Sequence, residues 1–173
     1  MKNGKVFWIT GLSGAGKTTL CQKLADHLRS QGRSVVVLDG DELRQAMGAT
    51  QNHARYERLE LAMRYAHLCR MISSQGVDVA IATISLFREV HEWNRTNTPG
   101  YIEIFIKVPL DELKRRDPKL IYARAERGEL INVAGLDFEI DEPQNPDVHI
   151  EWDADLTPEA AFAKLIESLN LGS

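Results

Sequence analysis

The chain places the residues Gly11-Leu12-Ser13-Gly14-Ala15-Gly16-Lys17-Thr18 directly after the apolar run Val6-Phe7-Trp8-Ile9. Together they complete the pattern G-x-x-x-x-G-K-[ST], in which a strand leads into a glycine-rich turn that opens a helix. The glycines let the backbone turn inward, so that its N–H groups and the helix N-terminus can hold phosphate oxygens. This context predicts a nucleoside-triphosphate site rather than a glycine-rich turn with a surface lysine.

Each polar group of this phosphate loop has an expected role. Lys17 can reach the β- and γ-phosphates and is a candidate catalytic residue, and Thr18 offers its hydroxyl to Mg²⁺. The residues expected to bind the triphosphate are Ser13, Gly14, Ala15, Gly16, Lys17, Thr18 and Thr19.

Length and composition favour one ordinary globular domain over residues 1–173, with 43% hydrophobic and 27% charged residues. The net charge of −4 argues against a general nucleic-acid binder. No apolar run approaches the roughly 18 residues that cross a bilayer, and residues 6–9 are too few for a secretory signal. We therefore expect a cytoplasmic protein with no membrane or nucleic-acid partner.

Short apolar runs alternate with helical patterns, which is typical of a parallel α/β sheet flanked by helices. Strands are expected at 5–10, 35–38, 77–82, 102–108 and 149–152, and helices at 17–29, 59–72 and 158–169. Thr157 is a plausible cap for the last helix. Residues 109–135 form a charged, mostly helical stretch that contributes little obvious core.

Two carboxylates, Asp39 and Asp41, follow the second strand in the sequence Leu38-Asp39-Gly40-Asp41. Ligands of open α/β sheets lie beyond the carboxyl ends of strands, so both acids would face the phosphate loop if this strand lies near the first. Phosphoryl transfer needs one carboxylate that orients the attacking hydroxyl or accepts its proton, and further carboxylates that hold the waters of Mg²⁺. The alternative is a polar turn leaving a strand.

The segment from Thr83 to Arg88 follows the third strand and should occupy the same edge of the sheet. Ser85 is expected to cap a helix that begins near Leu86, or to hydrogen-bond a ligand. The two roles are compatible.

Cations gather in Lys114-Arg115-Arg116-Asp117-Pro118-Lys119, with Arg124 and Arg127 beyond, although the chain as a whole is acidic. Such a run is usually a solvated helix face. Beside a phosphate loop it favours a mobile cationic lid, here placed at residues 114–135, which excludes water and stabilises charge on the transferring group.

Taken together, these segments resemble the adenylylsulfate kinase family over nearly the whole chain. Residues 11–19 match its phosphate loop, and 38–41 with Arg44 resemble its D-G-D-x-x-R element. Residues 84–88 resemble I-S-P-[YF]-R, and 116–119 with Tyr122 resemble R-D-P-K-G-L-Y. Residues 135–137 and 143–147 resemble its G-I-D and P-x-N-P elements. Many NTPases share the loop, whereas the ordered set is specific.

The resemblance implies a three-layer, adenylate-kinase-like P-loop NTPase fold and transfer of the ATP γ-phosphoryl group to the ribose 3′-hydroxyl of a small nucleotide. ATP and Mg²⁺ are the implied cofactors, and members are commonly homodimers. Asp41 would lie near the attacking hydroxyl, while Asp39 would touch metal waters or the acceptor nucleotide. The other residues implied around the acceptor nucleotide are Arg44, Arg55, Ile84, Ser85, Leu86 and Lys119. Some members carry a phosphoserine at the position of Ser85, which direct in-line transfer does not require.

Departures from the family fall on the acceptor side. Arg58 replaces an asparagine, Val133 stands where the family has a phenylalanine, and the family's G-F pair is not recognisable in Gly48-Ala49-Thr50-Gln51. In a typical member the two phenylalanines that are missing here sandwich the adenine of the acceptor nucleotide. Stacking of a base on an aromatic ring contributes about 1–3 kcal/mol. Substitutes for them could come from Tyr56, Phe87 or Trp93.

Three readings therefore compete. The first is an adenylylsulfate kinase, and the second keeps the chemistry but acts on another nucleotide conjugate. A cytidine diphosphate conjugate such as cytidine diphosphoramidate, from surface-polysaccharide biosynthesis, has a smaller base that needs less stacking. The third is a GTPase-like or non-catalytic nucleotide-binding module. It is disfavoured because N/T-K-x-D and D-x-x-G elements are missing and Lys17, Thr18, Asp39 and Asp41 are all present.

Overall fold

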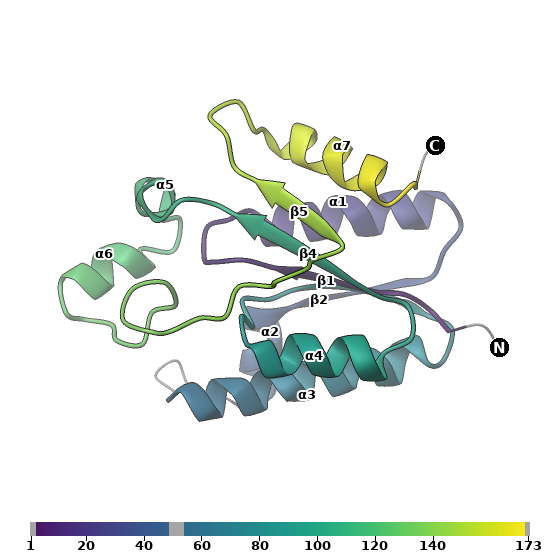
Figure 1. Ribbon diagram of the computed structural model, residues 1–173, viewed down its shortest axis with the longest axis horizontal. Helices are drawn as coiled ribbons and strands as arrows, with labels where there is room; N and C mark the ends of the chain where they lie inside the picture. The colour runs from purple at the N-terminus through teal and green to yellow at the C-terminus, as the bar shows by residue number, and fades with distance from the viewer. Residues whose placement is uncertain (1–2, 49–53, 172–173) are drawn as a thin grey trace.

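A parallel five-stranded sheet with the order β2-β3-β1-β4-β5 forms the centre of the molecule (Figure 1). The structure is a computed structural model that describes residues 3–48 and 54–171. The strands are β1 (Val6–Thr10), β2 (Val35–Asp39), β3 (Asp78–Ala82), β4 (Tyr101–Lys107) and β5 (Val148–Glu151). Each predicted strand is confirmed with its ends shifted by at most one residue.

Helices cover both faces of the sheet, which confirms the three-layer α/β class (Figure 1). On one face lie α1 (Lys17–Ser30) and α7 (Pro158–Ser168), and on the other lie α3 (Arg55–Ser73) and α4 (Arg88–Asn97). Three short helices are α2 (Gly40–Ala46), α5 (Leu110–Arg116) and α6 (Ile121–Glu126). Thr157 caps α7 as predicted, since its hydroxyl accepts a 3.1 Å hydrogen bond from the Ala160 N–H.

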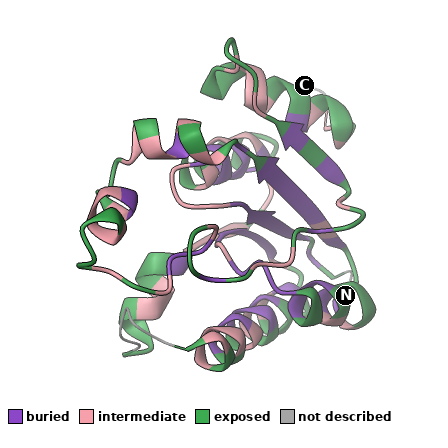
Figure 2. Cartoon of the chain, turned by 60° about the vertical axis from the view of Figure 1, so that its left-hand side comes forward, coloured by how far each residue is buried: buried purple, intermediate pink, exposed green. Residues whose placement is uncertain are grey.

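The middle strand β1 is fully buried, since its successive side chains point into two different cores. The strands at the centre of the sheet are coloured as buried in Figure 2. Phe7 and Ile9 pack on the side of α1, whereas Val6 and Trp8 pack on the side of α3. This two-sided burial explains the uninterrupted apolar run that precedes the phosphate loop.

The segment after β4 contributes more core than its sequence suggests. Leu113 of α5 is fully buried and Tyr122 of α6 is 1% exposed, and both join the cluster around Phe7 and Ile9. The expectation of little core here is therefore wrong. Each of these short helices buries only one side chain, which leaves no readable periodicity.

None of the helices in the described ranges has the length and apolar character that a membrane span requires.

Candidate active site

The phosphate loop adopts the backbone conformation that its glycines allow. Gly14 and Gly16 have φ values of 82° and 94°, in the left-handed region, and α1 begins at the next residue, Lys17. Gly11 packs so closely against β4 that an added Cβ would lie 2.5 Å from the carbonyl oxygen of Ile106. The loop therefore presents a helix N-terminus at the carboxyl edge of the sheet, the arrangement that suits an anion.

Lys17 lies within this loop, where its ammonium group donates a 2.7 Å hydrogen bond to the carbonyl oxygen of Leu12. Burial, and then the positive charge of Lys119, lower the pKa of Lys17 to about 8, although the carboxylates of Asp41 and Asp39 oppose the shift. Lys17 thus lies in electrostatic reach of both predicted acids and of a predicted lid residue.

Thr18 and Asp39 are joined by a 2.8 Å hydrogen bond from the hydroxyl to the carboxylate. The strand of Asp39 is not the neighbour of β1, because β3 lies between β1 and β2. Asp39 also accepts a 2.9 Å hydrogen bond from the Asp41 N–H and so caps α2. Asp39 therefore forms the polar turn that was given as the alternative, and it also lies beside the phosphate loop as the site interpretation requires.

This oxygen pair fits what Mg²⁺ prefers, since the ion takes hard oxygen ligands. Among the described residues no group of three or more His, Cys, Asp and Glu side chains could hold a metal. Mg²⁺ is usually bound by one or two protein oxygens, with substrate phosphates and water as its other ligands.

Asp41 lies at the start of α2 with two cations against its carboxylate. Arg44 approaches it to 3.1 Å, and the ammonium group of Lys119 donates a hydrogen bond to it from 78 residues away in the sequence. Burial alone would raise the pKa of Asp41, but the hydrogen bond and charge of Lys119, with Arg44 and Lys17, outweigh it and lower the pKa. Asp41 is therefore an ionised hydrogen-bond acceptor at neutral pH.

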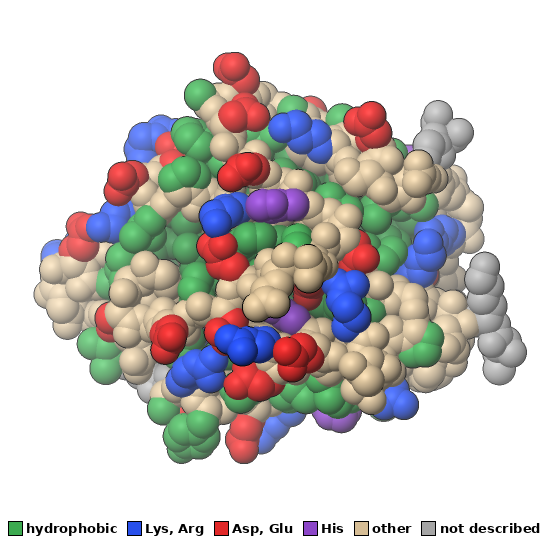
Figure 3. Space-filling view, in the orientation of Figure 1, with side chains coloured by type: hydrophobic (Ala, Val, Ile, Leu, Met, Phe, Trp, Pro, Cys, Tyr) green, Lys and Arg blue, Asp and Glu red, His purple; other side chains and the backbone are tan. Residues whose placement is uncertain are grey.

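The predicted lid packs directly on the phosphate loop. The Tyr122 hydroxyl donates a 3.0 Å hydrogen bond to the carbonyl oxygen of Ser13, and Leu113 and Pro118 border Gly14. Basic and acidic side chains alternate over this face of the molecule (Figure 3). The other cations of the lid pair with nearby acids: Lys114 with Glu126, Arg115 and Arg116 with Glu112 just before the lid, and Arg124 and Arg127 with Glu129. Lys119 instead reaches the site.

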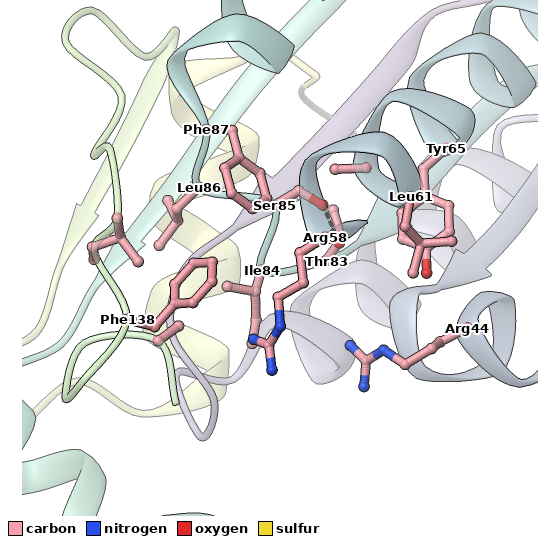
Figure 4. Close-up of a pocket in the computed structure, with 13 residues that line it drawn as sticks. Arg44, Arg58, Leu61, Tyr65, Thr83, Ile84, Ser85, Leu86, Phe87 and Phe138 are labelled. Atoms are coloured by element: carbon pink, nitrogen blue, oxygen red, sulfur yellow. Dashed lines mark hydrogen bonds between the residues drawn. The ribbon is translucent and has the colours of Figure 1, made fainter. Parts of the chain in front are cut away.

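A pocket opens beside Asp41, because Arg44 both contacts that carboxylate and lines the pocket (Figure 4). The predicted Ile84, Ser85 and Leu86 line it as well. Arg55 does not. Its guanidinium pairs with Asp141 at 2.8 Å, so its predicted contact with the acceptor nucleotide stays a prediction.

Two arginines cover the aromatic rings of this pocket. The guanidinium of Arg58 lies 4.9 Å from the ring centre of Phe138, and that of Arg55 lies 5.3 Å from the ring centre of Phe87. The two rings meet edge to face at 6.1 Å. Burial, and then the charge of Arg44, lower the pKa of Arg58, while Asp137 opposes the shift.

Ser85 does not cap a helix, so that expectation is wrong. The first residue of α4 is Arg88, and its N-cap position is held by Phe87 without a side-chain hydrogen bond. Ser85 has a left-handed φ of 31°, and its hydroxyl lies 2.7 Å from the Thr83 hydroxyl. An imidazole nitrogen of His91 lies 3.2 Å from the Ser85 carbonyl oxygen. The ligand role of Ser85 stays a prediction.

Of the three aromatic residues proposed to stack on a base, Phe87 lines the pocket. Tyr56 is 65% exposed outside it, and the ring of Trp93 lies against that of His67, tilted by 51° with the ring centres 4.3 Å apart. Residues 49–51, where the family's G-F pair was sought, lie outside the described residues.

The pocket also contains residues that the sequence did not single out as site residues: Arg58, Leu61, Ala62, Tyr65, Thr83, Ala134, Phe138 and Ile140. The first four share one face of α3, since they are spaced at i, i+3, i+4 and i+7. That stripe was readable, but it resembles an ordinary core face. Phe138 comes from a loop and gave no periodic signal.

Comparison with known proteins agrees with this geometry. The profile of the adenylylsulphate kinase family matches residues 3–151. A cytidine diphosphoramidate kinase of Campylobacter jejuni is 38% identical over 83% of this chain and 85% of its own length. An adenylyl-sulfate kinase of Picosynechococcus is 36% identical over 98% of this chain and 96% of its own.

The fold has a close counterpart among solved structures. The APS kinase of Mycobacterium tuberculosis, in complex with AMPPNP and APS, superposes with a TM-score of 0.88 and 31% identity. The alignment covers 98% of this chain and 99% of that one. This chain therefore belongs to the adenylylsulphate kinase family, and it is a P-loop nucleotide kinase, a phosphotransferase that acts on a hydroxyl group.

Proposed function

We propose that this kinase transfers the γ-phosphoryl group of ATP to the ribose 3′-hydroxyl of a small nucleotide. The observation that carries the proposal is the convergence of Lys17, the Thr18–Asp39 pair and Asp41 at one edge of the sheet. A nucleotide-triphosphate mimic and a nucleotide acceptor together in the Mycobacterium tuberculosis relative support it.

The residues of this chain divide into two groups in the proposal. Residues 13–19 hold the triphosphate, with Lys17 at its β- and γ-phosphates, and Thr18 and Asp39 hold Mg²⁺. ATP with Mg²⁺, when bound, supplies an activated phosphoryl group whose charge is partly neutralised. Asp41 orients the 3′-hydroxyl and accepts its proton, since its carboxylate is ionised at neutral pH.

The acceptor nucleotide occupies the pocket beside Asp41, in contact with Arg44 and the segment Ile84–Leu86. Lys119 passes from Asp41 to an anionic group of the acceptor nucleotide, while the lid at 114–135 shields the site from water. Arg55 stays a proposed contact. The proposal also includes a single domain over 1–173, a homodimer and a cytoplasmic location, where ATP is abundant.

Cytidine diphosphoramidate is a second candidate for the acceptor nucleotide. Arginines cover both pocket rings, which removes flat surface on which a purine could stack. The Campylobacter jejuni relative that carries this activity in its name supports the same reading.

A panel of adenylyl and cytidylyl nucleotides, incubated with ATP and Mg²⁺ and examined by mass spectrometry, tests the proposal. We expect ATP consumption to depend on one of the added nucleotides, which gains the mass of one phosphate. Equal ATP hydrolysis with and without every nucleotide would contradict it.

A further inference from the structure

Arg58 occupies a position from which it can read the acceptor base. It lies in the first turn of α3, and its side chain crosses the pocket with the guanidinium beside that of Arg44 and next to Phe138 (Figure 4). Arg44 contacts Asp41, so this part of the pocket adjoins the proposed reacting hydroxyl. Arg58 therefore lies on the acceptor side of the site, away from the phosphate loop.

Phe138 constrains how Arg58 can bind. The ring is 8% exposed, and the guanidinium lies 4.9 Å from its centre, in the range of a cation–π contact. The guanidinium thus lies beside a ring that is almost fully buried, and its N–H groups lie along its rim. Phe87, only 4% exposed and covered by Arg55, offers no alternative platform.

The rim of a guanidinium carries paired parallel N–H donors, which match two hydrogen-bond acceptor atoms placed side by side. Cytosine has such a pair in O2 and N3. In adenine, N1 and N7 each stand beside the donating N6 amino group, and in uracil the N3–H donor separates O2 from O4. Guanine has the pair O6 and N7, but its larger ring system gains most from stacking surface that is covered here.

We propose that Arg58 is a specificity-determining residue that selects cytosine as the acceptor base by donating two hydrogen bonds to O2 and N3. The inference rests on the proposed function, because it assigns a base to the pocket in which the acceptor nucleotide would bind. It goes beyond that function by naming the residue and the feature of the base that it recognises.

The test uses matched acceptors that separate the base from the 5′-group: the phosphosulfates and the diphosphoramidates of cytidine, uridine, adenosine and guanosine. For the wild-type enzyme we expect kcat/KM for cytidine to exceed that for uridine by about tenfold or more in both series. Uridine is the decisive comparison, because its ring has the same size and stacks alike. A guanosine rate above that of cytidine would overturn the assignment to cytosine.

Arg58→Lys keeps the charge but loses the paired donors. We expect the cytidine-to-uridine ratio to fall to about one, mainly through a higher KM for cytidine, with ATP affinity and melting temperature unchanged. Arg64→Lys, at an exposed position of the same helix, is the matched control and should keep the wild-type ratio. Phe138→Leu should lower the ratio without removing charge.

Two failures can be told apart. If the wild-type enzyme phosphorylates none of the eight nucleotides, the proposed function fails. If it phosphorylates cytidine and uridine equally well, or if Arg58→Lys lowers kcat/KM equally for all bases, the kinase assignment stands and the reading of the base by Arg58 is wrong.

Discussion

The hydroxyl of Thr18 in the first turn of α1 and the carboxylate of Asp39 at the end of β2 are joined by a 2.8 Å hydrogen bond. They meet although β3 lies between β2 and β1, the strand that leads into the phosphate loop. The bond joins the phosphate loop to the acidic turn after β2. An ion that uses both oxygens would replace this hydrogen bond.

We therefore expect Asp39→Asn to raise the Mg²⁺ concentration that gives half-maximal activity by about tenfold or more, since an amide oxygen lacks the charge that attracts the ion. Activity measured over a Mg²⁺ titration at saturating ATP checks this. Asp26→Asn, on α1 away from the site, is the control. An unchanged Mg²⁺ requirement in Asp39→Asn would exclude Asp39 from the metal site.

Asp41→Asn should lower kcat by about 10²–10⁴-fold, the usual contribution of a general base, while ATP binding changes little. The reason is that the amide can still hydrogen-bond a hydroxyl but cannot accept its proton. Turnover rates and ATP affinity measured on the same preparation separate the two effects. Wild-type turnover would remove Asp41 from the chemistry.

ATP binding should take up protons near pH 8. The pKa of Lys17 is lowered to about 8, so the amine is about half protonated there, and a triphosphate beside it would raise the pKa. Calorimetry in buffers of different ionisation enthalpy should give an uptake of about half a proton per site at pH 8. Lys17→Met should abolish the uptake, and the same uptake in that variant would assign it to another group.

Leu120, between α5 and α6, has a strained backbone. Its φ is 53°, and its side chain is 60% exposed, so little packing compensates for the left-handed backbone. Leu120→Gly should raise the free energy of unfolding by about 1 kcal/mol, whereas Leu120→Ala, which keeps the strain, should leave it nearly unchanged. Denaturant titrations compare the two. Equal stability of both variants would show that the backbone at Leu120 stores no strain.

His91 should make stability depend on pH. Burial lowers its pKa, and the opposing influences of Glu103, the Ser85 carbonyl and Asp141 are smaller. The folded chain therefore favours neutral imidazole, so this contribution is present above the unfolded pKa of about 6.5 and is lost as the pH falls below it. Unfolding free energies measured between pH 5 and 8 should show this slope, and His91→Gln should flatten it.

The sheet and the phosphate loop could be predicted because their signals are local. Buried parallel strands read as short apolar runs, and the loop is a contiguous motif whose glycines the backbone requires. Helix α2 was not predicted, because Gly40 and Asp41 at its start are typical of a turn. The hydrogen bond from the Asp41 N–H to the Asp39 carboxylate forms that turn, and the chain then continues into α2.

The pocket beside Asp41 could not be predicted in the same way. Arg58 and Phe138 meet only because α3 and the loop after α6 come together at one edge of the sheet. No periodicity connects residues so far apart in the chain. The sequence showed that the acceptor side departs from its family at Arg58, but not which ring would stand beside that residue.

Helix α1 also leads the chain away from the phosphate loop. It begins at Lys17, and near its other end the His27 imidazole lies 2.9 Å from the carbonyl oxygen of Leu171. The rise from Lys17 to His27 is about 15 Å. A fluorophore or resin tether joined next to Leu171 would thus attach far from the phosphate loop, which suits immobilised assays of turnover.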